Sequence, residues 1–231
     1  MQNKEKNGII VKKENFDRKG RTDMLYLNCL AFAALAYLVG GINGAIILSK
    51  LVYKEDIRTL GSKNPGFTNF KRLHGFAPAT FAVMAIDICK TILPVLLAKL
   101  IMQSTYGAGQ LAAAFALLGC MLGHAFPVWY DFKGGKAVMT FLAGVWFVDW
   151  RAGLICFGIF VIILFTIRFM SVASMSFAVL FPIALFILGC RNPITLAIMA
   201  AAGILVVARH HQNIKRLREG TESKFYLKKK K

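Results

Sequence analysis

Long runs without charged residues constrain this 231-residue chain more than any other feature. The first run extends from Met24 to Leu48, and only Asn28 and Asn43 dilute it with polar side chains. A helix rises about 1.5 Å per residue, so about 20 such residues cross the hydrocarbon core of a bilayer. The apolar region of a secretory signal is shorter, about 7–15 residues. We therefore predict a retained membrane-spanning helix.

Further apolar segments follow, separated by short polar stretches. They cover residues 76–100, 108–130, 137–148, 152–167, 169–190 and 192–208. The segments 137–148 and 152–167 are short for a span, so they form either two short helices hinged at Asp149 or one long helix with a charged break. We predict an all-α integral membrane protein, a bundle of about seven transmembrane helices, with about five as the alternative count.

This membrane domain, residues 24–208, lies between two basic regions. The N-terminal tail over residues 1–23 is polar, and we expect it to be disordered or to lie on the membrane surface. The C-terminal segment over residues 209–231 ends in four lysines. A solvated or headgroup-contacting role is expected for it.

The formal net charge of +18 needs an explanation. Lys and Arg flank membrane helices and are enriched in cytoplasmic loops. With the N-terminus outside, 18 of these residues face the cytoplasm and 10 the exterior. We predict that residues 49–75, 131–136 and 209–231 share the cytoplasmic side. Nucleic-acid binding is disfavoured, because no recognition motif accompanies the charge.

The cysteines argue against a disulfide framework or a metal site. They are five in number, form no Cys-x-x-Cys pair and lie in apolar segments. Small, buried, apolar side chains are the better interpretation, and no metal is predicted.

The polar segment with the sequence GSKNPGFTNFKR, residues 61–72, has the composition of an anion site. Its glycines let backbone amides approach an anion, and its Ser, Thr and Asn side chains add donors. Arg72 can grip a phosphate with two parallel donors. An ordinary basic turn is the alternative.

A second polar segment combines GHAFP at residues 123–127 with FKGGK at 132–136. A Gly-Gly pair between lysines at a helix start can form an anion-binding nest. It is not a Walker A loop, because Tyr130 and Ala137 stand where Gly and Ser or Thr are required. For His124, near a helix end, we favour a hydrogen-bonded structural role over a functional one.

The third segment is RHHQNIKRL, residues 209–217. His210 and Asn213 are three residues apart, so a helix places them on one face. A metal site from His210 and His211 is disfavoured, because neighbours on a helix point in different directions.

Charged and hydroxyl side chains also occur within the apolar segments. Asp87 and Lys90 lie mid-segment, where a functional site or a structural ion pair would explain them. Ser171 and Ser174 follow Arg168 and can bond a ligand or cap a helix.

The runs GSKNPGFTNFKR, GHAFPVWYDFKGGKAV and RHHQNIKRL occur in this order between apolar segments. Together they resemble the three motifs of the bacterial acyl-phosphate:glycerol-3-phosphate acyltransferases (PlsY-type), over about residues 30–224. The resemblance implies a plasma-membrane enzyme of phospholipid biosynthesis that moves a fatty acyl group from acyl phosphate to glycerol-3-phosphate, giving lysophosphatidic acid. It implies no cofactor; the partners are the two substrates and membrane lipids, and a monomer is compatible with it.

The resemblance also implies residue roles. His210 becomes a general base or substrate orienter, working with Asn213. Lys136 best matches the family's motif-two lysine, and Lys133 is the second choice. The remaining predicted contacts with substrate phosphate are Ser62, Asn64, Gly66, Asn69, Arg72, Gly134, Gly135, Ser171 and Ser174.

The sequence departs from the family pattern in several places. These departures are Lys63, Phe67, Ala137 and the run Gly41-Ile42-Asn43. A transporter of organic anions is the competing interpretation, because it would use the same basic loops and the intramembrane Asp87 and Lys90.

Overall fold

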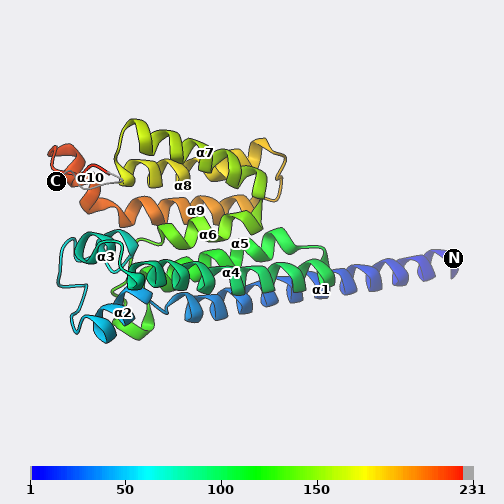
Figure 1. Ribbon diagram of the computed structural model, residues 1–231. Coiled ribbons are helices and arrows are strands. Elements are labelled where there is room, and N and C mark those ends of the chain that lie inside the picture. Colours follow the sequence, from blue (N-terminus) through cyan, green and yellow to red (C-terminus); the bar gives the residue numbers. More distant parts are fainter. Residues whose placement is uncertain (1, 226–231) are drawn as a thin grey trace.

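The computed structural model describes residues 2–225, with side chains from residue 19 onward, and this part of the chain is helical without strands (Figure 1). The helices are α1 (Gln2–Gly40), α2 (Gly44–Val52), α3 (Phe67–His74), α4 (Pro78–Tyr106), α5 (Gly109–Ala125), the 3₁₀ turn η1 (Val128–Tyr130), α6 (Val138–Val148), α7 (Trp150–Thr166), α8 (Met170–Ile187), α9 (Pro193–Arg209) and α10 (His211–Arg218). The predicted all-α membrane class is confirmed.

The helix α1 starts much earlier than the first predicted span. It begins at Gln2, although residues 1–23 were expected to be disordered or to lie on the membrane surface. The chain has no proline before Pro65 to interrupt a helix that continues outward from the span. In Figure 1 this part of α1 projects beyond the rest of the bundle.

The predicted first span is broken near its end. Helix α1 stops at Gly40, and Asn43 caps α2 by accepting a hydrogen bond from the backbone N–H of Ile46 at 3.0 Å. A side-chain acceptor at this position satisfies one of the free donors of a new helix. The span therefore ends in a short, separately capped helix.

The short apolar segments 137–148 and 152–167 are two helices, α6 and α7. Asp149 separates them and caps α7, accepting from the N–H groups of Arg151 at 2.9 Å and Ala152 at 3.3 Å. The alternative of one long helix is excluded.

Each of the apolar segments predicted from the sequence is helical in the structure. Within the described residues, four helices are long and apolar enough to cross a membrane, or five if the bent pair α9 and α10 is one span. Helices α6 and α7 are apolar but shorter. The count of about seven stays a prediction that includes these two.

Helices α1 and α5 pack backbone against backbone. A Cβ atom added at Gly119 or Gly123 would overlap the carbonyl oxygens of Ala33 and Tyr37. Small residues four apart allow such close approach in membrane helices, where dispersion contacts replace the hydrophobic drive. This contact fixes α1 beside α5 and, through α5, beside α4 and α6.

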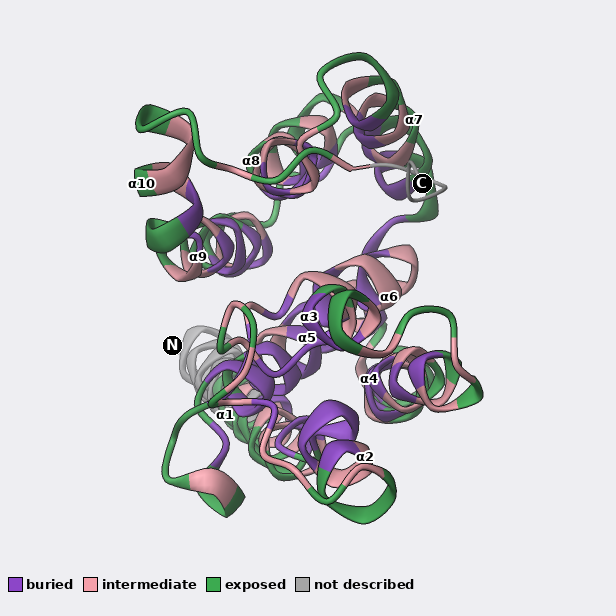
Figure 2. Cartoon of the chain, turned by 60° about the vertical axis from the view of Figure 1, so that its left-hand side comes forward, coloured by how far each residue is buried: buried purple, intermediate pink, exposed green. Residues whose placement is uncertain are grey.

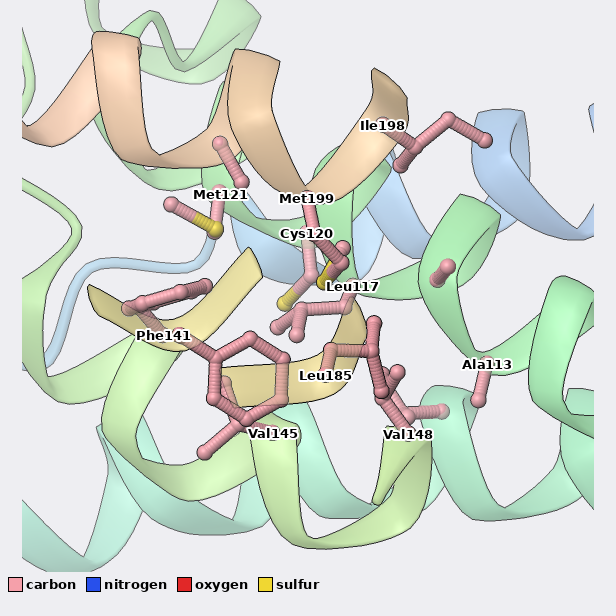
Figure 3. Close-up of a cluster of buried hydrophobic side chains, with 14 of the residues drawn as sticks. Ala113, Leu117, Cys120, Met121, Phe141, Val145, Val148, Leu185, Ile198 and Met199 are labelled. Atoms are coloured by element: carbon pink, nitrogen blue, oxygen red, sulfur yellow. The ribbon is translucent and has the colours of Figure 1, made fainter. Parts of the chain in front are cut away.

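The main core lies between α5, α6, α8 and α9 (Figure 3). The side chains of Leu117, Phe141, Leu185 and Met199 from these four helices point toward one another there. Figure 2 shows α7, α8 and α9 grouped on one side, with α1, α4 and α5 on the other. Helix α6 contacts α4, α5 and α7, so it joins the two groups.

The three predicted polar segments meet at one end of the bundle. Helices α2, α3 and α10 and the start of α4 lie at the left of Figure 1, opposite the projecting part of α1. That they share one end is therefore confirmed.

The contact between α1 and α5 can be tested by overpacking. Gly119→Leu should lower the free energy of unfolding by about 1–3 kcal/mol or more, because the new side chain must separate two backbones. Gly158→Leu on α7 is the matched control, since a side chain there would meet nothing within 4 Å. Thermal unfolding of purified protein in detergent measures both. Equal stability of the two variants would contradict the packing described.

Candidate functional site

A cavity of about 920 Å³ lies at the end of the bundle where the three polar segments meet. One part of its wall comes from the loop before α3, from α3 and from α4. Another comes from the loop before α6 and from the starts of α6 and α8. The junction of α9 and α10 and the residues from Glu222 to Phe225 complete it. Ten of the predicted site residues line it, namely Ser62, Asn64, Gly66, Asn69, Arg72, Lys136, Ser171, Ser174, His210 and Asn213.

Asn69 shapes the first loop. Its side-chain amide donates to the carbonyl of Leu60 at 3.0 Å, and its amide oxygen accepts from the N–H of Ser62 at 2.9 Å. The side chain is almost wholly buried, with 1% exposed. Asn69 therefore holds Ser62 at the cavity wall from behind the loop.

The break in the first span reaches the same loop. The Asn43 side chain donates to the carbonyl of Pro65 at 3.1 Å while it caps α2. This Asn departs from the family's usual residue, and it couples the end of the span to the residues just before α3. The loop is thus anchored on two sides.

Arg72 lies in the last turn of α3 and is exposed. Among the described residues it makes no hydrogen bond or ion pair, although it lines the cavity. A guanidinium with free donors suits a phosphate, which it can bind through two parallel hydrogen bonds.

The Gly-Gly pair lies behind the cavity wall. The carbonyls of Gly134 and Gly135 accept from the Arg209 guanidinium at 2.8 and 3.0 Å, and the Gly135 N–H donates to the carbonyl of His124 at 3.0 Å. Neither glycine lines the cavity, and exposed Lys133 does not either. The substrate contacts predicted for these three residues stay predictions.

Lys136 is the motif-two lysine that reaches the cavity. Its ammonium donates to the side-chain oxygen of Asn213, which brings the second and third motifs into contact. Burial lowers the pKa of Lys136 to about 8, and the positive charge of Arg216 adds to the effect.

His210 lies at the junction of α9 and α10 with only 3% of its surface exposed. Its Nδ1 lies 2.7 Å from the carbonyl oxygen of Val206. A carbonyl only accepts, so Nδ1 carries the proton of the neutral ring and Nε2 keeps a lone pair. The ring is therefore fixed in the form that can accept a proton at Nε2.

Glu222 is the site residue that the sequence reasoning missed. Its carboxylate accepts from the Asn213 amide at 2.6 Å, the Ser171 hydroxyl at 2.8 Å and the Arg216 guanidinium at 2.7 Å. Burial by itself would raise the pKa of Glu222, but these hydrogen bonds outweigh it and lower the pKa. The sequence contains one signal for it, because Glu222 is one of only two acidic residues in the otherwise basic segment 209–231.

Asp87 and Lys90 form a buried ion pair, with 2.7 Å between the carboxylate and the ammonium. The structural ion pair considered from the sequence is therefore present. Asp87 and His124 also line the cavity, whereas Lys90 lies behind them.

Another part of the cavity wall is apolar. It is formed by side chains that include Phe67, Phe76, Met84, Leu142 and Phe160. The site thus joins a basic region to an apolar region in one space. A molecule with a phosphate at one end and a hydrocarbon chain at the other matches this division.

A metal centre has no support in the described residues. They contain no group of three or more His, Cys, Asp or Glu side chains placed to hold an ion.

Comparison with known proteins gives a consistent result. The family model described as glycerol-3-phosphate acyltransferase matches residues 30–220. A glycerol-3-phosphate acyltransferase of Coxiella burnetii is 36% identical over 193 residues, which are 84% of this chain and 96% of the relative. Another, from Rhodopseudomonas palustris, is 36% identical over 202 residues, which are 87% and 97% of the two chains.

Two crystal structures of PlsY, an integral membrane glycerol 3-phosphate acyltransferase, are also similar. The glycerol 3-phosphate form has a TM-score of 0.76 and 32% identity, covering 86% of this chain and 96% of PlsY. The lysophosphatidic acid form has a TM-score of 0.72 at the same identity, covering 86% and 95%.

The role of Glu222 predicts a loss of stability on substitution. Glu222→Ala leaves the Asn213, Ser171 and Arg216 donors without their acceptor, so the free energy of unfolding should fall by about 2–4 kcal/mol. Glu219→Ala is the matched control, because Glu219 only approaches Lys215 at 3.8 Å on the surface. Its effect should stay below about 1 kcal/mol. Thermal unfolding of both variants at neutral pH tests this, and equal losses would contradict it.

Proposed function

This chain belongs to the glycerol-3-phosphate acyltransferase family, and we propose that its acyl donor is a fatty acyl phosphate. The reaction gives lysophosphatidic acid and inorganic phosphate, and it belongs to phospholipid biosynthesis. The observation that carries the proposal is the single cavity in which Arg72, Lys136 and Arg216 adjoin an apolar wall. Both substrates carry phosphate, and one of them also carries a hydrocarbon chain.

Charge supports binding of two anionic substrates. Arg72 makes no hydrogen bond or ion pair to a described residue, and Lys136 is bonded only to a neutral amide. The two carboxylates that line the cavity are neutralised, Asp87 by Lys90 and Glu222 by Arg216. An incoming phosphate therefore meets cations and neutral donors, which stabilise its negative charge.

We assign the phosphate contacts accordingly. Arg72 and Lys136 supply charge, and Ser62, Asn64, Asn213 and the amides that follow Gly66 at the start of α3 supply neutral donors. Ser171 and Ser174 lie on the facing helix α8. Gly134 and Gly135 support the loop that carries Lys136 through their bonds with Arg209, and a substrate contact of their own or of Lys133 stays a prediction.

The proposed reaction is a direct transfer. The oxygen of a glycerol-3-phosphate hydroxyl attacks the acyl carbonyl carbon, the bond from that carbon to the phosphate oxygen breaks, and phosphate leaves with the electron pair. The hydroxyl proton goes to Nε2 of His210 or to the departing phosphate, in which case His210 orients substrate with Asn213. Both routes balance: phosphate takes the electron pair of the broken bond, and the proton reaches phosphate directly or is released by His210 to phosphate or water after the transfer.

The serine contacts favour direct transfer over an acyl-enzyme. The Ser171 hydroxyl donates to Glu222, which the Asn213 amide and the Arg216 guanidinium also hold, and the Ser174 hydroxyl donates to the carbonyl of Met170 at 2.7 Å. Neither hydroxyl is paired with a histidine. An acylated serine or cysteine trapped during turnover and identified by mass spectrometry would contradict direct transfer.

A reconstituted assay separates the enzyme from the anion transporter. Purified protein in liposomes should form lysophosphatidic acid from palmitoyl phosphate and glycerol-3-phosphate, and should not form it when palmitoyl coenzyme A replaces the acyl phosphate. His210→Ala should lower kcat by about 100- to 10,000-fold if His210 is the base. If His210 only orients substrate, the loss should appear mainly in KM. Uptake of glycerol-3-phosphate without product would support the transporter.

The lowered pKa of Lys136 predicts a pH effect. As pH rises through about 8, Lys136 loses its proton and its attraction for phosphate. The value of kcat/KM, which reports the free enzyme, should therefore fall above that pH. In Lys136→Arg the fall should vanish, since Arg stays protonated. An unchanged alkaline fall in that variant would assign it to another group.

We propose that the cavity end faces the cytoplasm of the bacterial cell, as the distribution of basic residues predicts. Cysteines introduced at Lys54 and Lys224, both exposed near the cavity end, should react with a membrane-impermeant reagent only from the inside. A cysteine at exposed Ser104, at the far end of α4, should react from the outside. The opposite pattern would reverse the orientation.

A further inference from the structure

The buried ion pair behind the cavity includes a third member, His124. The Lys90 ammonium lies 2.7 Å from the Asp87 carboxylate, 2.8 Å from Nδ1 of His124 and 2.7 Å from the carbonyl oxygen of Ile42. All three side chains are buried, with 2%, 4% and 4% of their surfaces exposed for Asp87, Lys90 and His124. The reaction described above uses none of them.

These contacts determine where the proton of His124 lies. An ammonium has three hydrogens and no lone pair, so it can only donate. Because the Lys90 ammonium cannot accept, Nδ1 of His124, at 2.8 Å from it, must be the acceptor. A neutral imidazole that accepts at Nδ1 carries its hydrogen on Nε2. Lys90 thus fixes His124 as a donor at Nε2.

The position of Nε2 shows where this donor is available. A Cβ atom added at Gly135 would overlap Nε2 and would lie 3.1 Å from the carbonyl oxygen of Pro65. The ring edge is therefore beside both the Gly-Gly loop and the loop before α3, at the wall of the cavity. Within the described residues Nε2 has no hydrogen-bond partner.

We propose that the Nε2–H of His124 donates a hydrogen bond to a phosphate oxygen of the bound substrate, and that Lys90 with Asp87 is a positioning pair that keeps the ring in this tautomer. The proposal rests on the proposed function. It explains why a buried charge is kept despite its cost. A neutral Lys90 amine could also accept a hydrogen bond from Nδ1 of His124, so it would not fix the tautomer of the ring. It also explains why Asp87 beside the cavity does not repel phosphate.

The test must avoid leaving one buried charge alone, which by itself destabilises a protein. Asp87→Asn combined with Lys90→Met removes both charges, and His124→Phe removes the donor but keeps a ring. Each should raise KM for a phosphate substrate roughly 10- to 100-fold while kcat changes little, as expected for one lost hydrogen bond to a charged group. His124→Gln keeps an N–H near the same place and should recover most of the affinity.

Coupling separates positioning from a general effect on folding. Adding Asp87→Asn and Lys90→Met to His124→Phe should raise KM no further, because the pair acts through the ring. Thr91→Val is the matched control. Thr91 is a buried neighbour of Lys90 whose hydroxyl donates to the carbonyl of Asp87 at 2.8 Å, and its variant should keep the wild-type KM. Additive losses would overturn the positioning role.

Two measurements do not depend on turnover. The spectrum of ¹⁵N-histidine-labelled protein should show Nδ1 of His124 without a proton, and the double variant should lose that signature. Calorimetry with glycerol-3-phosphate alone should show weaker binding in His124→Phe if the donor serves the acceptor substrate; an effect confined to KM for acyl phosphate assigns it to the donor substrate. A proton on Nδ1, or unchanged constants for both substrates, would overturn the proposal. Absence of acyl transfer by the wild type would instead refute the proposed function.

Discussion

A bilayer offers no water to satisfy a polar group, and this constraint governs the whole structure. The backbone meets it by forming helices throughout the described residues. Side chains meet it by pairing: the Asn43 side chain bonds the N–H of Ile46 after the break in the first span and the carbonyl of Pro65 before α3, and Lys90 has three partners. Neither Asn43 nor Lys90 lines the cavity, but Asn43 holds the loop before α3 and Lys90 holds Asp87 and His124, and that loop and these two side chains form part of the cavity wall.

The cavity region contains several basic side chains, and their partners reduce the repulsion between them. Lys136, Arg209 and Arg216 are held close together because the Gly134 and Gly135 carbonyls take up Arg209 and Glu222 takes up Arg216. Lys136 has one neutral partner, Asn213, and Arg72 makes no hydrogen bond or ion pair to a described residue. Some cations therefore hold the cavity wall together, and others remain available to bind a ligand. A count of basic residues in the motifs does not distinguish the two groups.

The sequence predicted the parts that depend on local pattern. Apolar runs located the helices, and motif residues such as Ser62, Arg72, Lys136 and His210 do meet in one cavity. It did not predict the helical extension of α1. The polar composition of residues 1–23 favoured disorder or a surface location, although the segment contains no helix-breaking proline. Nor did it predict Glu222, since one carboxylate in a basic segment acquires its meaning only from partners on α8 and α10. Long-range contacts of this kind leave no periodic signal.

The last described residues close the cavity. Glu222 and Phe225 line it, and the Phe225 N–H donates to the carbonyl of Arg168 at 2.6 Å, which ties the chain back to the start of α8. During synthesis every membrane-length helix can therefore enter the bilayer before the cavity has its final wall. A chain truncated before Glu222 would therefore retain all of these helices but lack this part of the cavity wall.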